Sequence, residues 1–190
     1  MRKIFILIIF AFFSFKAFAG CDDPIGDSVD YTNCRFSEGQ DLAGSYLPNS
    51  NLSFASFIKV NFNKSIMMNS ILGFGTFSES SFVRANLYES NLQGANFEMS
   101  DFSSANLTRV NFTGATLIEA NFKNSNLENS VGWDGCNRPC NMILTDANLS
   151  GLNLAHITQT KAVFDAYLRG VNLSNSNLIG MDFSNRDLSN

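Results

Sequence analysis

Histidine is nearly absent from this chain, whose 190 residues contain one, His156. A lone histidine offers no serine–histidine–aspartate set, and it adds too little to the cysteines to complete a zinc site. The sequence also has no glycine-rich loop with the spacing that cradles a phosphate. These absences predict a protein that is not an enzyme and that holds no metal ion and no cofactor.

Clustered positive charge is missing as well. The 13 basic residues are scattered among 17 acidic ones, and the formal net charge is −4. Direct binding to nucleic acid requires a basic face, so we do not expect it. A net negative charge mainly supplies solubility.

The most apolar stretch lies at the N-terminus and is too short to span a bilayer as a stable helix. A basic start at Arg2 and Lys3 precedes it, and Ala17-Phe18-Ala19 follows it as a cleavage signal. Residues 1–19 are therefore predicted to be a signal peptide, cleaved near Ala19, so that the mature protein is periplasmic or secreted. Removing Arg2, Lys3 and Lys16 takes the net charge from −4 to −7.

A second interpretation of the same region remains open. Phe18-Ala19-Gly20-Cys21 resembles a lipoprotein signal, although Phe18 stands where leucine is usual. Acylation of Cys21 would anchor the protein to a membrane, which we do not otherwise expect it to contact.

Four cysteines become interpretable if the protein is exported, because disulfides persist outside the cytoplasm. Cys21 and Cys34 bracket a polar, turn-rich segment, and Cys136 and Cys140 lie close together near the middle of the chain's second half. Four cysteines allow three pairings. Proximity favours Cys21–Cys34 and Cys136–Cys140.

A five-residue repeat dominates the chain between Leu42 and Leu127. Every fifth residue is large and apolar for eighteen positions, made up of nine Leu, eight Phe and one Met. Two residues before each of them, from Ser45 to Ser125, stands a small residue: eight Ser, six Ala, two Val and one Gly. A repeat this regular predicts a solenoid.

The period of five excludes a simple helix or strand. On a helix the large residues would spread around the surface, and on a straight strand they would alternate between faces. The small and large residues of one repeat are two apart, as on a strand, so each repeat is expected to be a short extended piece followed by a turn. Large residues four repeats apart match in kind, as Phe62, Phe82 and Phe102 do, which predicts columns and a coil with four sides.

This pattern, seen in Ala85-Asn86-Leu87-Tyr88-Glu89, resembles the pentapeptide-repeat family. The resemblance implies an all-β solenoid, a right-handed, four-sided (quadrilateral) β-helix of about seven coils. Asparagine often precedes the large residue, and we expect it to satisfy the backbone of an outward turn rather than to bind a ligand. Some members of the family are acidic DNA mimics that bind type II topoisomerases, which the resemblance makes an alternative function for this chain.

The repeat is interrupted after Leu127. Two Gly and one Pro between Val131 and Asn141 indicate irregular backbone around the sole tryptophan. This segment either packs onto the edge of the coil or forms a disulfide-pinned interaction loop through Trp133, Asp134, Asn137 and Arg138.

The expected organisation has five parts: 1–19 signal peptide, 20–36 disulfide-bonded cap, 37–128 β-helix, 129–143 inserted loop and 144–190 continued β-helix. We interpret the protein as an exported, non-catalytic structural or interaction scaffold with an unidentified protein partner. A carbohydrate-active β-helix enzyme is a further alternative, because outward carboxylates such as Glu79 and Glu89 occur along the repeat. An open sheet edge at the end of the last coil allows an end-to-end homodimer.

Overall fold

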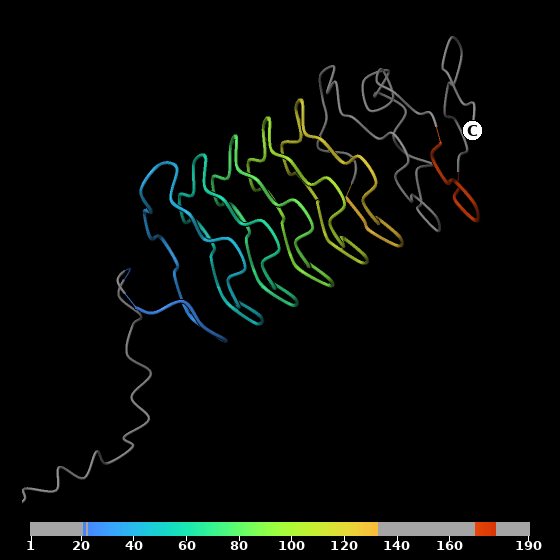
Figure 1. Cartoon of the computed structure of the whole chain (residues 1–190). Coiled ribbons are helices and arrows are strands. Elements are labelled where there is room, and N and C mark those ends of the chain that lie inside the picture. Colours follow the sequence, from blue (N-terminus) through green and yellow to red (C-terminus); the bar gives the residue numbers. More distant parts are fainter. Residues whose placement is uncertain (1–20, 22, 133–169, 178–190) are drawn as a thin grey trace, which may run out of the picture.

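The computed structural model describes residue 21, residues 23–132 and residues 170–177. Residues 30–131 wind into coils that stack along one axis (Figure 1). The described residues contain no helix and no extended strand. Isolated parallel bridges between successive coils hold the stack instead, and they begin at Asp30 and end at Val131.

The coil has four walls, because most bridges join residues twenty apart, such as Asp41 with Asn61 and Asn61 with Ser81. Each wall takes one five-residue repeat from every coil. The walls are defined here by the ranges 41–45, 61–65, 81–85, 101–105 and 121–125 (first); 46–50, 66–70, 86–90, 106–110 and 126–130 (second); 51–55, 71–75, 91–95 and 111–115 (third); and 56–60, 76–80, 96–100 and 116–120 (fourth).

The interior is filled by the large residues of the repeat, all eighteen of which are buried. Phe62 stacks on Phe82 and Phe82 on Phe102, with ring centroids 5.0 and 4.8 Å apart. Phe77 stacks on Phe97 in a second column at 5.0 Å. The columns predicted at intervals of twenty residues are therefore confirmed, and with them the right-handed quadrilateral β-helix. The number of coils is not tested, because part of the repeat lies outside the described residues.

Turns form the corners between the walls. The carbonyl of Leu52 accepts a hydrogen bond from the amide of Ala55, and nearly every repeat does the same. The third residue of each such turn has a positive φ, as at Phe54 (59°) and Lys64 (60°). Few of these corner residues are glycine, so most coils hold ordinary side chains in a left-handed conformation that such residues adopt at a cost.

The asparagines that precede the large residues complete these turns. The side-chain oxygen of Asn96 accepts from the amide of Glu98, and that of Asn106 accepts from the amide of Thr108. Asn106 also donates to Asn86 one coil earlier, at 3.1 Å. The predicted structural role of these asparagines is confirmed, because their oxygens satisfy backbone amides.

Serine hydroxyls at the small positions tie coils together. Ser70 donates to the carbonyl of Leu47, and Ser100 donates to the carbonyl of Phe77, in each case across 23 residues. These bonds lie in the second and fourth walls. In the third wall the small residues are alanine or glycine, so that wall has no such ties within 51–115.

The β-helix begins earlier than the repeat suggested, inside the segment expected to be a cap. Asp30 bridges Asn51 and Arg35 bridges Ser56, 21 residues apart instead of twenty. The ring of Phe36 stacks on Phe57 with centroids 4.2 Å apart. One extra residue between Arg35 and Asp41 therefore places this first coil out of step with the strict period of five.

The regular coil also extends past Leu127, since Asn111 bridges Val131. The first residues of the expected 129–143 insertion thus still belong to the repeat. Residues 170–177 contain the same local turn, in which the amide of Ser176 donates to the carbonyl of Leu173. The signal peptide at 1–19 and most of the expected continuation at 144–190 lie outside the described residues.

Candidate interaction surfaces

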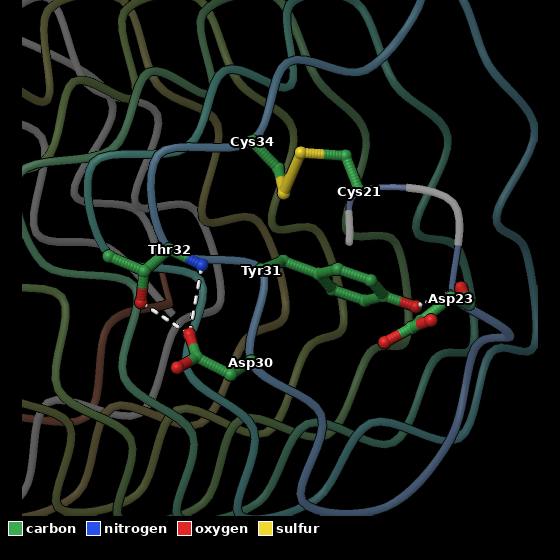
Figure 2. Close-up of a disulfide and its surroundings, with 6 residues drawn as sticks. All are labelled: Cys21, Asp23, Asp30, Tyr31, Thr32 and Cys34. Carbon is green, nitrogen blue, oxygen red and sulfur yellow. Dashed lines mark hydrogen bonds between the residues drawn. A yellow bond between two sulfur atoms is a disulfide. The ribbon is translucent and has the colours of Figure 1, made fainter. Parts of the chain in front are cut away.

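The N-terminal end of the β-helix is closed by a disulfide between Cys21 and Cys34, which confirms the predicted pairing (Figure 2). Cys34 is buried because it occupies the small position two residues before Phe36. The ring of Tyr31 lies beside this link and is also buried. Its hydroxyl donates to the backbone carbonyl of Asp23 at 2.8 Å.

These contacts set the protonation state of Tyr31. Burial raises the pKa of the phenol, and the negative charge of Asp23 raises it further. The hydroxyl therefore stays protonated at neutral pH and remains a hydrogen-bond donor. The first coil and the segment before it are joined by this bond as well as by the disulfide.

A shallow, open hollow lies beside the disulfide. Its lining residues are Cys21, Asp23, Pro24, Ile25, Arg35, Phe36, Ser37 and Gln40. It contains no pair of groups suited to acid–base or nucleophilic catalysis. Within residues 21 and 23–132 and 170–177, no group of three or more His, Cys, Asp or Glu side chains could hold a metal ion. The same part of the chain has no helix that could cross a membrane.

Charged side chains on the walls pair between coils. Lys59 lies 2.6 Å from Glu38 in the coil before it and 3.9 Å from Glu79 in the coil after it. On the second wall, Arg109 lies 2.8 Å from Glu89. The hydrogen bonds from these cations lower the pKa of both Glu38 and Glu89. All of these groups are exposed, so the pairs contribute little to stability.

Both signs of charge occur on three of the four walls. The charged residues are Asp41, Lys64, Arg84, Asp101 and Lys123 on the first wall, Glu89, Arg109 and Glu128 on the second, and Lys59, Glu79, Glu98 and Glu119 on the fourth. The third wall differs, because its ranges 51–55, 71–75, 91–95 and 111–115 contain no charged residue.

The third wall also carries exposed apolar side chains. Phe54 and Phe74 are more than half exposed and stack on each other with ring centroids 5.3 Å apart. Sequence reasoning missed this surface because it considered outward residues singly. Arranging the outward positions in columns of twenty would have found it.

The interaction loop predicted at Trp133, Asp134, Asn137 and Arg138 lies outside the described residues, and so does the predicted Cys136–Cys140 pair. Neither prediction is tested. The described part of the chain therefore offers its outer walls and its disulfide-closed end as candidate surfaces.

Comparison with known structures supports this fold. The chain is 22% identical to a pentapeptide repeat protein (Rfr23) from the cyanobacterium Cyanothece 51142, with a TM-score of 0.52 over 55% of this chain and 85% of the other. It is 17% identical to HetL, a pentapeptide repeat protein involved in heterocyst differentiation regulation from Nostoc sp. strain PCC 7120, with a TM-score of 0.52 over 81% and 86%. These identities show the fold alone.

No curated protein matches the sequence. The family model for pentapeptide repeats, in contrast, matches eight copies in residues 41–73, 76–109, 100–131 and 166–190. These ranges cover more than half of the chain and coincide with the observed coils wherever the structure describes them. The chain therefore belongs to the pentapeptide-repeat family.

Proposed function

We propose that this protein is an exported, non-catalytic scaffold that binds a protein partner through the outer walls of its β-helix. The observation that carries the proposal is the division of the repeat into an apolar inside and a regular outside. The large and small positions are buried, and the turn asparagines bond to the backbone. The chemistry left for recognition lies in the outward residues of the walls.

The disulfide supports export. Cys21 and Cys34 are bonded, and structural disulfides are characteristic of proteins outside the reducing cytoplasm. The same bond weighs against the lipoprotein alternative, because the sulfur of Cys21 cannot be both acylated and joined to Cys34. Periplasmic or secreted location after cleavage near Ala19 is the arrangement that fits both features.

The topoisomerase-binding DNA mimic is less well supported. A surface that imitates DNA presents regularly spaced negative charge, whereas each charged wall here carries cations among its carboxylates. Lys59 and Arg109 even neutralise neighbouring carboxylates between coils. The carbohydrate-active enzyme is likewise disfavoured, since the outward carboxylates Glu79 and Glu89 each lie beside a cation, Lys59 or Arg109.

The proposal is tested by expressing the full chain in a bacterium and recovering it from cell fractions. We expect the protein in the periplasmic fraction or the medium, with an intact mass that starts at Gly20 and lacks two hydrogens for the Cys21–Cys34 bond and two more for the predicted Cys136–Cys140 bond. Retention of residues 1–19 in cytoplasmic protein would contradict export. Covalent capture of partners from the exported fraction then tests the scaffold role, and a protein that enriches no partner contradicts it.

A further inference from the structure

The third wall presents an uncharged outer surface. Its outward positions hold amide, hydroxyl and apolar side chains, and no charged residue occurs in its four ranges. Four of the seven large apolar side chains exposed in the described residues belong to it or continue it: Phe54, Ile71, Phe74 and Val131. Phe54 and Phe74 stack on each other, and exposed apolar side chains that adjoin in this way mark an interaction site more often than single exposed residues do.

The outward side chains of this wall differ in size from coil to coil along the axis. The corner column reads Phe54, Phe74, Gly94 and Gly114 from one coil to the next. The ring of Phe74 leans over Gly94, where a Cβ atom would lie 2.5 Å from the ring. Among the described residues, a Cβ atom at Gly114 would instead meet nothing closer than the Cα atom of Gly94 at 4.0 Å. The column is therefore high at its N-terminal half and low at its C-terminal half.

The next column has the opposite profile. It reads Ser53, Gly73, Gln93 and Thr113, so its larger side chains lie where the corner column is low. When two such walls face each other with their helix axes antiparallel, each column of one copy lies against the same column of the other copy. The two columns then run in opposite directions. Phe54 then lies over the Gly114 of the other copy, and Gly73 lies over its Gln93.

We propose that the third wall is a self-complementary surface through which two copies of this chain associate side by side and antiparallel. A two-fold axis in the plane of the interface produces this arrangement, in which the same patch serves both subunits. Phe54 and Phe74 are its apolar anchors, and Gly114 leaves the space that receives a ring. This contact differs from an end-to-end dimer, which would use the last coil.

Charge favours the third wall as the contact between two copies. The chain is acidic, with a formal net charge of −4, so two copies repel each other through walls that carry carboxylates. The third wall is the surface of the described β-helix where no like charges meet. Four coils span roughly 20 Å at the spacing of neighbouring strands, which gives a small interface and hence weak, reversible association.

Sedimentation of the full chain over about 10 µM to about 1 mM covers the range expected of a weak interface. We expect a monomer–dimer equilibrium that is not weakened by added salt, because screening reduces repulsion between acidic copies. The double variant Phe54→Asn/Phe74→Asn removes both anchors and keeps residues that tolerate a positive φ. We expect it to weaken dimerisation by about tenfold or more.

Matched controls separate this effect from a change in folding. Met99→Asn alters an exposed apolar side chain at the same turn position on the fourth wall and should leave dimerisation unchanged. Gly114→Asn fills the low half of the column without removing an apolar group, and it should weaken the dimer. Gly44→Asn, at a glycine of similar φ on the first wall, should not.

Cross-linking fixes the orientation. A Ser53→Cys protein mixed with a Thr113→Cys protein should form a linked heterodimer in preference to either linked homodimer. Linkage of Ser53→Cys with itself would overturn the antiparallel arrangement. The proposal would be overturned if the protein stayed monomeric over the whole concentration range, which would leave the wall to a different partner. It would also be overturned if the Phe54→Asn/Phe74→Asn change left the dimer intact.

Discussion

The hydroxyl of Ser90 donates a hydrogen bond to the backbone carbonyl of Met67, which lies 23 residues earlier and one coil away, at 2.6 Å. Ser65 occupies the same small position of the repeat and is equally buried, yet its hydroxyl has no hydrogen-bond partner. The repeat therefore uses one residue type in two energetically different ways.

Replacing these two serines by alanine should change stability in opposite directions. Ser65→Ala removes an unsatisfied buried hydroxyl and should raise the free energy of unfolding by about 1 kcal/mol. Ser90→Ala removes a bond between coils and should lower that free energy by about 1 kcal/mol. Denaturant unfolding of the two variants measures both effects, and equal destabilisation would contradict the assignment of Ser65 as unsatisfied.

The inside and the outside of one repeat should differ sharply in cost. Phe97 is fully buried between Phe77 and Phe102, so Phe97→Ala should destabilise the protein by about 3–5 kcal/mol. Asn96→Ala loses one turn hydrogen bond near the surface and should cost less than about 1 kcal/mol. Similar costs in denaturant melts would mean that the two faces are wrongly assigned.

The disulfide should stabilise the first coil. Changing both Cys21 and Cys34 to alanine keeps a small residue at the buried position of the repeat and opens a loop whose ends are 13 residues apart. The chain-entropy model gives a loss of up to about 3 kcal/mol for a loop of this size. Hydrogen exchange should accelerate at the amide of Phe36, which bonds to Ser56, more than at the amide of Phe102. Uniform acceleration along the β-helix would contradict a local effect.

Alkaline pH should loosen the same end. The pKa of Tyr31 is raised above its ordinary value of 10.0 in the folded protein, chiefly by burial and then by Asp23. The stability that this group contributes is therefore fully present below pH 10 and is lost as the pH rises through the higher folded value. The difference in phenolate absorbance between the wild type and Tyr31→Phe should appear above pH 10. A difference centred on the ordinary value would show that Tyr31 is not buried as described.

Much of this fold follows directly from the sequence. The order of Phe and Leu at the large positions was sufficient to predict four walls, because Phe62 and Phe82 can stack only if twenty residues complete a coil. The Cys21–Cys34 bond could be predicted from proximity and the expectation of export. Both inferences depend on interactions that are local or strictly periodic.

The remaining features depend on departures from the period. The extra residue between Arg35 and Asp41 shifts Tyr31 and Phe36 out of register, although Tyr31 is still buried and Phe36 still packs on the core through Phe57. The third wall escaped prediction for another reason, because an exposed Phe54 has meaning only beside Phe74 and the glycines that follow in its column. Relations across coils that involve unlike residues leave no repeating signal along the chain.

The disulfide-linked segment at the N-terminal end affects whether further coils could add to the β-helix there. Tyr31 and Cys34 belong to its first coil yet are almost inaccessible, so the segment held by the Cys21–Cys34 bond covers part of the end of the aromatic interior. Phe36 of the same coil is only partly buried, and Asp30 and Arg35 bridge only the coil that follows. A coil added by a neighbouring molecule would therefore have to displace the disulfide-held segment, which disfavours elongation of a coil-on-coil filament at this terminus.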